Sequence, residues 1–405
     1  MICRAACIAC ILLTPAFPQW TQWGGPNGNF TASGKGIADA WPVTGPKQMW
    51  KRVLGEGYSG VVAANGTLYT MYSKGAQETV IALEAATGKT KWEYSYSTEG
   101  GRLDLSNGQG PHSTPLLLGD RLYTIGIRAR MHAFDVKTGR PVWQKDLYKD
   151  FPGSTEFDRG YAVSPIPYKD TIVVKLGGSN HAIVALNPKD GSLLWQKHSF
   201  GNSPATPVIV NAGGRDVLLT QFAGEVVAMQ PGNGELLWSH PHRTDYGLNI
   251  TPPVLARGNI AVVTSAYSGG ARGLQLPTTS GNPTELWKHN RLRVHFTTAL
   301  AIGDHVYGSS GDFGPAPLTC VEARTGNVVW QDRTFSKANL IQAGDKVILL
   351  DEDGTLALVS LSPQGLRVLA KSEHVSLNNS WTPPALDGTT LYVRDRKHLV
   401  AIDLR

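Results

Sequence analysis

The chain has 405 residues, of which 41 % are hydrophobic and 17 % are charged, with a formal net charge of +6. These proportions are ordinary for a soluble globular protein, and no apolar run in the folded part is long enough to span a membrane. The mild positive charge is compatible with an acidic ligand or an anionic surface, but no nucleic-acid-binding motif accompanies it.

Residues 1–16 are predicted to be a secretory signal peptide, with Arg4 as its charged start and an apolar run from Ala5 to Leu13. Residues 17–40 would then be a lead-in segment before the folded domain. The protein is therefore expected to be exported in a bacterium, to the periplasm or to the outside. A lipid anchor on Cys10 stays open. Removal of the signal would leave one cysteine, Cys320, at a position predicted to be buried.

A short pattern recurs along the chain, and its first copy is Ala82, Glu84, Gly88 and Trp92. Alternating apolar residues around the glycine indicate two short β-strands, joined by a turn in which glycine accepts a positive φ. The tryptophan of each copy is predicted to fill the seam between neighbouring copies. These structural tryptophans are Trp50, Trp92, Trp143, Trp195, Trp238, Trp287 and Trp330.

A second hairpin signal precedes each copy, with turns such as Asn65-Gly66 and Gly258-Asn259. Each repeat is therefore four antiparallel strands, and repeats of roughly 40–50 residues with this content are typical of β-propeller blades. The last copy stops at Arg405, before its glycine and its tryptophan. We expect residues 45–54 to supply the missing outer strand and close the ring. The predicted fold is all-β: an eight-bladed β-propeller of four-stranded antiparallel blades.

The repeat A-x-D-x-x-T-G-x-x-x-W, as in Ala133 to Trp143, resembles that of the pyrroloquinoline quinone (PQQ) type propellers over roughly residues 41–405. This superfamily holds quinoprotein alcohol dehydrogenases, the BamB-type outer-membrane assembly scaffold and uncharacterised secreted bacterial proteins. The opening Trp20 to Gly28 is similar to the lead-in of the secreted group. The shared residues are turn and seam residues, so the resemblance implies the fold more than a function.

The functional site is expected on the face where the longer, polar loops surround the central channel. Arg291, Arg293 and His295 alternate, so they would share one side of an extended segment. With basic residues of other loops they would form a cationic funnel for an anionic group. The candidate ligand- or partner-binding residues are His112, Arg128, Arg130, Tyr161, Asn180, His181, Asn249, Arg291, Arg293, His295 and Trp381.

Dehydrogenases of this superfamily add a Ca²⁺ ion under the quinone, an aspartate base and, commonly, adjacent cysteines. This chain has no adjacent cysteines, and no spacing in it singles out a set of metal ligands or a catalytic residue. Trp381 would be a platform for PQQ, with Arg128 or Arg130 meeting its carboxylates.

The sequence thus predicts an exported, non-catalytic, monomeric propeller that binds a protein partner or a small anionic ligand on its loop-rich face. The alternative is a PQQ-dependent, quinoprotein alcohol dehydrogenase-like oxidoreductase, which would require PQQ and Ca²⁺ as cofactors.

Overall fold

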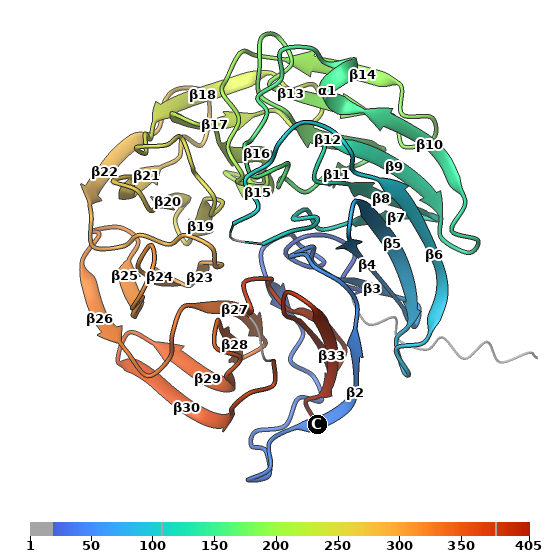
Figure 1. The fold of residues 1–405 in the computed structure, drawn as a ribbon. Coiled ribbons are helices and arrows are strands. Elements are labelled where there is room, and N and C mark those ends of the chain that lie inside the picture. Colours follow the sequence, from blue (N-terminus) through green and yellow to red (C-terminus); the bar gives the residue numbers. More distant parts are fainter. Residues whose placement is uncertain (1–18, 107, 377–378) are drawn as a thin grey trace, which may run out of the picture.

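The computed structural model describes residues 19–405 except 107 and 377–378, so the predicted signal peptide lies outside the described residues. The described chain forms eight β-sheets arranged in a ring, as Figure 1 shows. All pairings within the eight blades are antiparallel, which confirms the predicted eight-bladed β-propeller. The one helix in this part of the chain, α1 (Leu147–Asp150), has four residues, and no described helix could cross a membrane.

The first four blades follow one another in chain order, and each runs from its inner to its outer strand. Their strands are, in blade 1, β3 (Val62–Ala64), β4 (Thr67–Lys74), β5 (Gln77–Glu84) and β6 (Thr90–Ser97); in blade 2, β7 (Leu116–Leu118), β8 (Arg121–Ile125), β9 (Arg130–Asp135) and β10 (Pro141–Asp146); in blade 3, β11 (Ile166–Tyr168), β12 (Thr171–Lys175), β13 (Ile183–Leu186) and β14 (Leu193–Lys197); and in blade 4, β15 (Val208–Ala212), β16 (Arg215–Gln221), β17 (Glu225–Met229) and β18 (Leu236–Pro241).

The last four blades complete the ring in the same order. Their strands are, in blade 5, β19 (Val254–Ala256), β20 (Ile260–Ser265), β21 (Gly270–Gln275) and β22 (Thr284–His289); in blade 6, β23 (Leu300–Ile302), β24 (His305–Ser309), β25 (Leu318–Glu322) and β26 (Val328–Asp332); in blade 7, β27 (Ala338–Ala343), β28 (Lys346–Asp351), β29 (Leu356–Ser362) and β30 (Gly365–Ser372); and in blade 8, β31 (Ala385–Asp387), β32 (Thr390–Arg394), β33 (His398–Asp403) and β2 (Lys47–Val53).

Blade 8 combines the last three strands of the chain with a strand from its N-terminal part. Strand β2 pairs antiparallel with β33 from Lys47 opposite Asp403 to Val53 opposite His398. The outer strand that the last sequence copy lacks therefore comes from the N-terminal side, as predicted from its truncation. A second contact near the N-terminus is β1 (Thr31–Ala32), which pairs in parallel with the inner strand β27 of blade 7.

The outer-strand tryptophans join each blade to the next. The indole of Trp92 in blade 1 lies on Gly139 of blade 2, so close that a Cβ on this glycine would be 2.4 Å from a ring carbon. The indole N–H donates to the carbonyl of Val136 at 2.8 Å. Trp50, Trp143 and Trp287 make the same pair of contacts with the next blade. The turn position therefore requires glycine for two reasons: its φ is positive, and a Cβ would collide with the tryptophan ring of the preceding blade.

A belt of polar side chains links the blades around the channel. Ser and Thr residues just before the inner strands bond across several junctions: the backbone N–H of Thr114 donates to Ser164 Oγ, and that of Ser164 donates to Thr206 Oγ1. Thr382 Oγ1 donates to the carbonyl of Tyr58 at 3.0 Å and thus joins blade 8 to blade 1. Buried polar groups that are satisfied in this way hold the blades in one register.

The interior of the ring is apolar. Its largest cluster of buried residues runs through blades 6, 7, 8 and 1. Cys320 of β25 lies in this cluster as a free thiol, and burial raises its pKa to about 11. The expectation that it occupies a buried position is met.

Candidate functional site at the channel mouth

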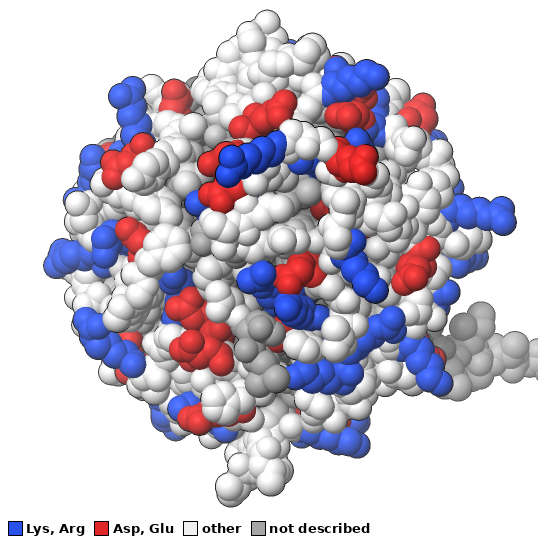
Figure 2. All heavy atoms as spheres, viewed as in Figure 1, with Lys and Arg blue, Asp and Glu red and all other residues white. Residues whose placement is uncertain are grey.

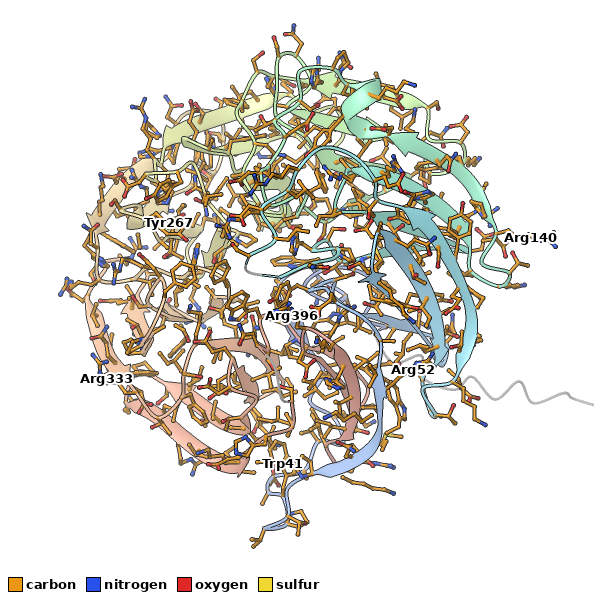
Figure 3. The ribbon with its side chains drawn as sticks, viewed as in Figure 1. Trp41, Arg52, Arg140, Tyr267, Arg333 and Arg396 are labelled. Atoms are coloured by element: carbon orange, nitrogen blue, oxygen red, sulfur yellow. The ribbon has the colours of Figure 1, made fainter. Side chains whose placement is uncertain are left out.

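Aromatic rings line the channel mouth on the loop-rich face, which is the face seen in Figures 1 to 3. They come from the residues that precede the inner strands of blades 1, 2, 6 and 8 and from three neighbouring loops. We call this set the aromatic collar. It consists of Tyr58, His112, Tyr246, Tyr267, His295, Phe296, Phe313 and Trp381, each in contact with another member of the set.

Four members of the collar form a stacked column. Trp381 lies between Phe296, at 4.8 Å between ring centroids and 15° between planes, and Tyr58, at 5.4 Å and 25°. Tyr58 in turn stacks on His112 at 5.9 Å. The Trp381 indole is therefore already stacked on two side chains of this chain. A flat cofactor that stacked on the indole would compete with these rings.

The other members meet edge to face. Tyr246 contacts Tyr267 at 5.2 Å and 89°, and Tyr267 contacts His295 at 4.7 Å and 84°. His295 also lies 6.2 Å from Phe313. Such T-shaped pairs place the positive ring edge on the negative ring face and add about 0.5–1.5 kcal/mol to the burial of the rings.

Polar groups beneath the collar hold the rings in place. The indole N–H of Trp381 donates to Glu352 Oε2 at 2.8 Å, and His295 Nε2 lies 3.2 Å from the hydroxyl of Tyr267. The ammonium of Lys337 lies 5.3 Å from the ring centroid of Phe296 and donates to the carbonyl of Asp312. Burial lowers the pKa of His295 to about 3, so this imidazole is neutral near pH 7.

Two long connections meet beside the column: residues 98–115, apart from 107, and residues 151–165, which follow α1; the backbone N–H of Asp104 donates to the carbonyl of Asp158. The guanidinium of Arg159 pairs with the carboxylate of Asp104 at 3.0 Å, and His112 Nε2 lies 3.2 Å from the carbonyl of Arg159. Gly108 packs so closely on Tyr58 that a Cβ there would lie 2.5 Å from the phenol ring. The loops therefore support the Tyr58 and His112 end of the collar.

The candidate arginines have different surroundings. Arg128, in the β8–β9 loop of blade 2, and Arg130, at the start of β9, donate to backbone carbonyls of Ser97, Thr98 and Gly101. The other two precede β23 of blade 6, on the other side of the ring in Figure 1. There, Arg293 lies 4.0 Å from Asp312, and Arg291 is exposed. Arg291, Arg293 and His295 thus lie in one segment before β23, across the ring from the blade 2 arginines.

The remaining candidate residues make contacts inside the framework. Tyr161 is fully buried and donates to the carbonyl of Lys175 at 2.8 Å. The side-chain amide of Asn249 is buried and donates to the carbonyl of Phe222. His181 is buried with no partner for its Nε2 among the described residues, whereas Asn180 beside it is exposed.

Charges of both signs are mixed over this face, as Figure 2 shows. In Figure 3, Arg396 lies toward the centre of the ring and Tyr267 lies over blade 5, whereas Arg52, Arg140 and Arg333 lie at the outer edge. Arg396 forms an ion pair with Glu56. Within the described residues, no three His, Cys, Asp or Glu side chains are grouped so that they could hold a metal ion.

Sequence reasoning marked Trp381, His295, His112 and also Tyr58, which all precede inner strands, but missed Tyr246, Tyr267, Phe296 and Phe313. These four lie in loops of different length, outside the repeating frame, so no periodic signal marks them. The available signal was their chemistry: large aromatic residues in Gly-, Ser- and Asp-containing loops, as in Ser310-Gly-Asp-Phe313. A loop has little apolar surface to cover, so an aromatic residue there indicates contact with something else.

Comparison with known proteins places these observations in a family. The family model described as outer membrane protein assembly factor BamB matches residues 77–332. Over 297 residues the chain is 24 % identical to BamB of Shewanella oneidensis, with 70 % of this chain and 71 % of that protein aligned. With BamB of Burkholderia pseudomallei it is 23 % identical over 249 residues, or 59 % of this chain and 60 % of that protein.

A shorter similarity links the chain to a dehydrogenase. It is 33 % identical over 165 residues to the quinoprotein alcohol dehydrogenase PedH of Pseudomonas putida, which is 37 % of this chain and 25 % of that protein. Among solved structures, BamB from Moraxella catarrhalis has a TM-score of 0.62 at 15 % identity and covers 88 % of this chain and 99 % of its own. The quinohemoprotein alcohol dehydrogenase of Comamonas testosteroni has a TM-score of 0.65 at 12 % identity, covering 96 % and 80 %. At these identities the structural similarities show the fold alone.

Proposed function

The chain belongs to the family described as outer membrane protein assembly factor BamB, and on this premise we propose that it is an exported, non-catalytic scaffold that binds a protein partner. The binding surface is the exposed end of the aromatic collar on the loop-rich face. The expected place of action is the bacterial cell envelope, because the curated relatives are named as assembly factors of the outer membrane.

The main observation behind this proposal is that two aromatic side chains, held by contacts with other rings, are exposed to solvent. Tyr246 is 72 % exposed and Phe313 is 58 % exposed, and they are the large apolar residues of the described loop-rich face that remain in solvent. The other exposed large apolar residues belong to outer strands or to the segment before β2. Rigid aromatic side chains beside arginines are the residues that most often dominate the binding energy of protein interfaces.

The surroundings of this pair favour a protein over a small anion. Arg293 already faces Asp312, and Asp245 accepts a hydrogen bond from Ser268 at 2.6 Å, so acidic and basic groups alternate around the rings. A polar rim of both signs around an aromatic centre is the usual composition of a protein–protein interface. Arg291, which is exposed and whose carbonyl accepts from Ser310 in the loop that carries Phe313, is the residue that we propose meets an acidic group of the partner.

The alternative function, a PQQ-dependent alcohol dehydrogenase, has the partial similarity to PedH in its favour. Two features of the mouth weigh against it. The platform expected at Trp381 already stacks on Phe296 and on Tyr58. The arginines expected to meet the quinone carboxylates, Arg128 and Arg130, donate to backbone carbonyls of their own blade junction. A quinone would have to displace packed rings and then find new cationic partners.

Co-purification from cell envelopes tests the proposal. A double variant, Tyr246→Ser with Phe313→Ser, should lose a specific partner that the parent protein retains, while its circular dichroism stays unchanged and its melting temperature falls only by the few degrees that the lost ring contacts imply. Leu193→Ser with Leu194→Ser is the matched control, because these residues are 46 % and 47 % exposed on an outer strand. Equal retention of the partner by both double variants would contradict the assignment of the binding surface.

A titration with PQQ and Ca²⁺ separates the two functions. We expect no Ca²⁺-dependent absorbance change and no alcohol-dependent reduction of a redox dye. A spectral change together with dye reduction would instead establish the dehydrogenase.

A further inference from the structure

The segment before the first blade forms a compact turn that the proposed function does not use. Its backbone is closed by three hydrogen bonds: Gly25 N–H to the carbonyl of Gln22, Gly28 N–H to that of Gly25, and Phe30 N–H to that of Gly24. Gly24 and Gly25 both have φ of +77°, a conformation that side chains rarely adopt. Gly25 also lies against the Trp20 ring, where a Cβ would be 2.7 Å from a ring carbon.

This turn lies at the mouth of the channel opposite the aromatic collar. Its carbonyls accept hydrogen bonds from inner strands of three blades. Ala63 N–H of β3 donates to the carbonyl of Trp20, and Leu117 N–H of β7 donates to that of Thr21, both at 2.8 Å. Gln342 N–H of β27 donates to the carbonyl of Phe30 at 2.9 Å. Figure 1 shows this N-terminal segment inside the ring.

The side chains of the segment reach across the channel. Trp20 and Phe30 are 2 % and 3 % exposed and belong to the core cluster of blades 6, 7, 8 and 1. Trp23, 4.6 Å from Phe30 in a T-shaped contact, packs against this cluster and also against the separate cluster of blades 4 and 5. One indole thus contacts both sides of the ring.

We propose that the far mouth of the propeller is a peptide-binding site, and that residues 20–38 of the same chain are the peptide that occupies it. Backbone pairing with exposed strand edges supplies the affinity, and the inserted tryptophans supply the specificity, as in other peptides that add to a sheet edge. We call residues 20–38 the plug. While the plug occupies the far mouth, the loop-rich mouth is the one from which a ligand or partner can enter the channel.

A matched pair of glycine variants tests the plug in the full-length protein. Gly25→Ala and Gly28→Ala both place alanine at a positive φ, +77° and +66°, but only the first collides with Trp20. Hydrogen exchange should therefore be about tenfold faster or more at Ala63, Leu117 and Gln342 in Gly25→Ala than in Gly28→Ala, since the seated segment holds these amides. Equal exchange at these amides in the two variants would contradict the binding of the plug to the inner strands.

A cleavable version tests whether the segment binds as a peptide. A protease site placed at Val43, a fully exposed residue, would cut the chain after folding. The released N-terminal fragment should co-elute with the propeller, and a labelled peptide of residues 19–38 should replace it. The same peptide with Trp23→Ala should compete about tenfold less well, as expected on loss of a buried aromatic anchor.

Two results would contradict the proposal. One is immediate loss of the cut fragment with no binding of the labelled peptide. The other is a dimer of the uncut protein in which the segment of each copy fills the mouth of its partner, because the occupant would then act between chains rather than within one.

Discussion

Gly139→Ala should destabilise the ring more than Gly119→Ala, although both glycines form turns of blade 2 and both have positive φ, +68° and +62°. The backbone strain, about 1 kcal/mol, is common to the two variants. A Cβ at position 119 meets nothing within 4 Å, whereas one at position 139 lies 2.4 Å from the Trp92 ring. The indole cannot shift freely, because its N–H is bonded to the carbonyl of Val136. Overpacking of this kind costs about 1–3 kcal/mol, so Gly139→Ala should lower the free energy of unfolding by about 2 kcal/mol more than Gly119→Ala.

Urea denaturation followed by circular dichroism measures this difference. A double-mutant cycle then identifies its cause, because in a Trp92→Ala background the collision is gone and the two glycine variants should cost the same. Equal costs in the parent protein would refute the seam contact. A difference that persists without Trp92 would assign the cost to the turn itself.

Three further predictions follow from the same structure. Trp143→Ala should lower the free energy of unfolding by about 3–5 kcal/mol, because it removes a seam ring whose indole N–H donates to the carbonyl of Pro188. Trp195→Ala should cost about 1 kcal/mol less, because the Trp195 indole N–H has no acceptor among the described residues; urea unfolding tests both variants. Thr251→Val should cost about 1–3 kcal/mol in the same assay, since its hydroxyl donates to the carbonyl of His295 in blade 6 and so links blade 5 to it. Acid should destabilise the fold: the pKa of His295 is about 3 when folded and about 6.5 when unfolded, so the unfolded state takes up the proton first as the pH falls. This costs about 2 kcal/mol at pH 5, and His295→Phe should reduce the fall in melting temperature between pH 7 and pH 5; an unchanged fall would contradict the assignment.

The architecture could be predicted because it repeats. A glycine and a tryptophan at fixed spacing are needed at nearly every blade junction, so the pattern appears many times, and two worn copies, ending at Trp287 and at Leu369, do not hide it. The truncation at Arg405 predicted that a strand near Trp50 would complete blade 8, because an outer strand is missing there. Such requirements are local and identical from blade to blade, which is why one sequence reveals them.

The polar belt also has a periodic signal in the sequence, which the prediction of the fold did not include. Ser or Thr followed by proline precedes an inner strand at Thr114, Ser164, Thr206, Thr251 and Thr382. The repeat resembles ordinary turn chemistry, so it does not by itself indicate bonds between blades.

The collar could not be predicted in the same way, because it depends on which loops meet across the ring. Phe296 stacks on Trp381 although blade 7 lies between their blades. Blade 7 contributes Asn339, whose side-chain amide accepts from the backbone N–H of Thr298 and donates to the carbonyl of Trp381. Whether an arginine is free for a ligand depends likewise on distant partners. Arg130 meets the carbonyl of Ser97, a contact across 33 positions of the chain that no local pattern encodes.

The most direct test of the account is site-specific photo-crosslinking in intact cells. A photoreactive phenylalanine analogue at Phe313 and, separately, at Tyr246 should give an adduct with the same protein, because both side chains belong to one docking surface. The analogue at Val142, which is 45 % exposed on the outer strand β10, should not give this adduct. Adducts at Val142 with none at Phe313 or Tyr246 would contradict partner binding through the loop-rich face.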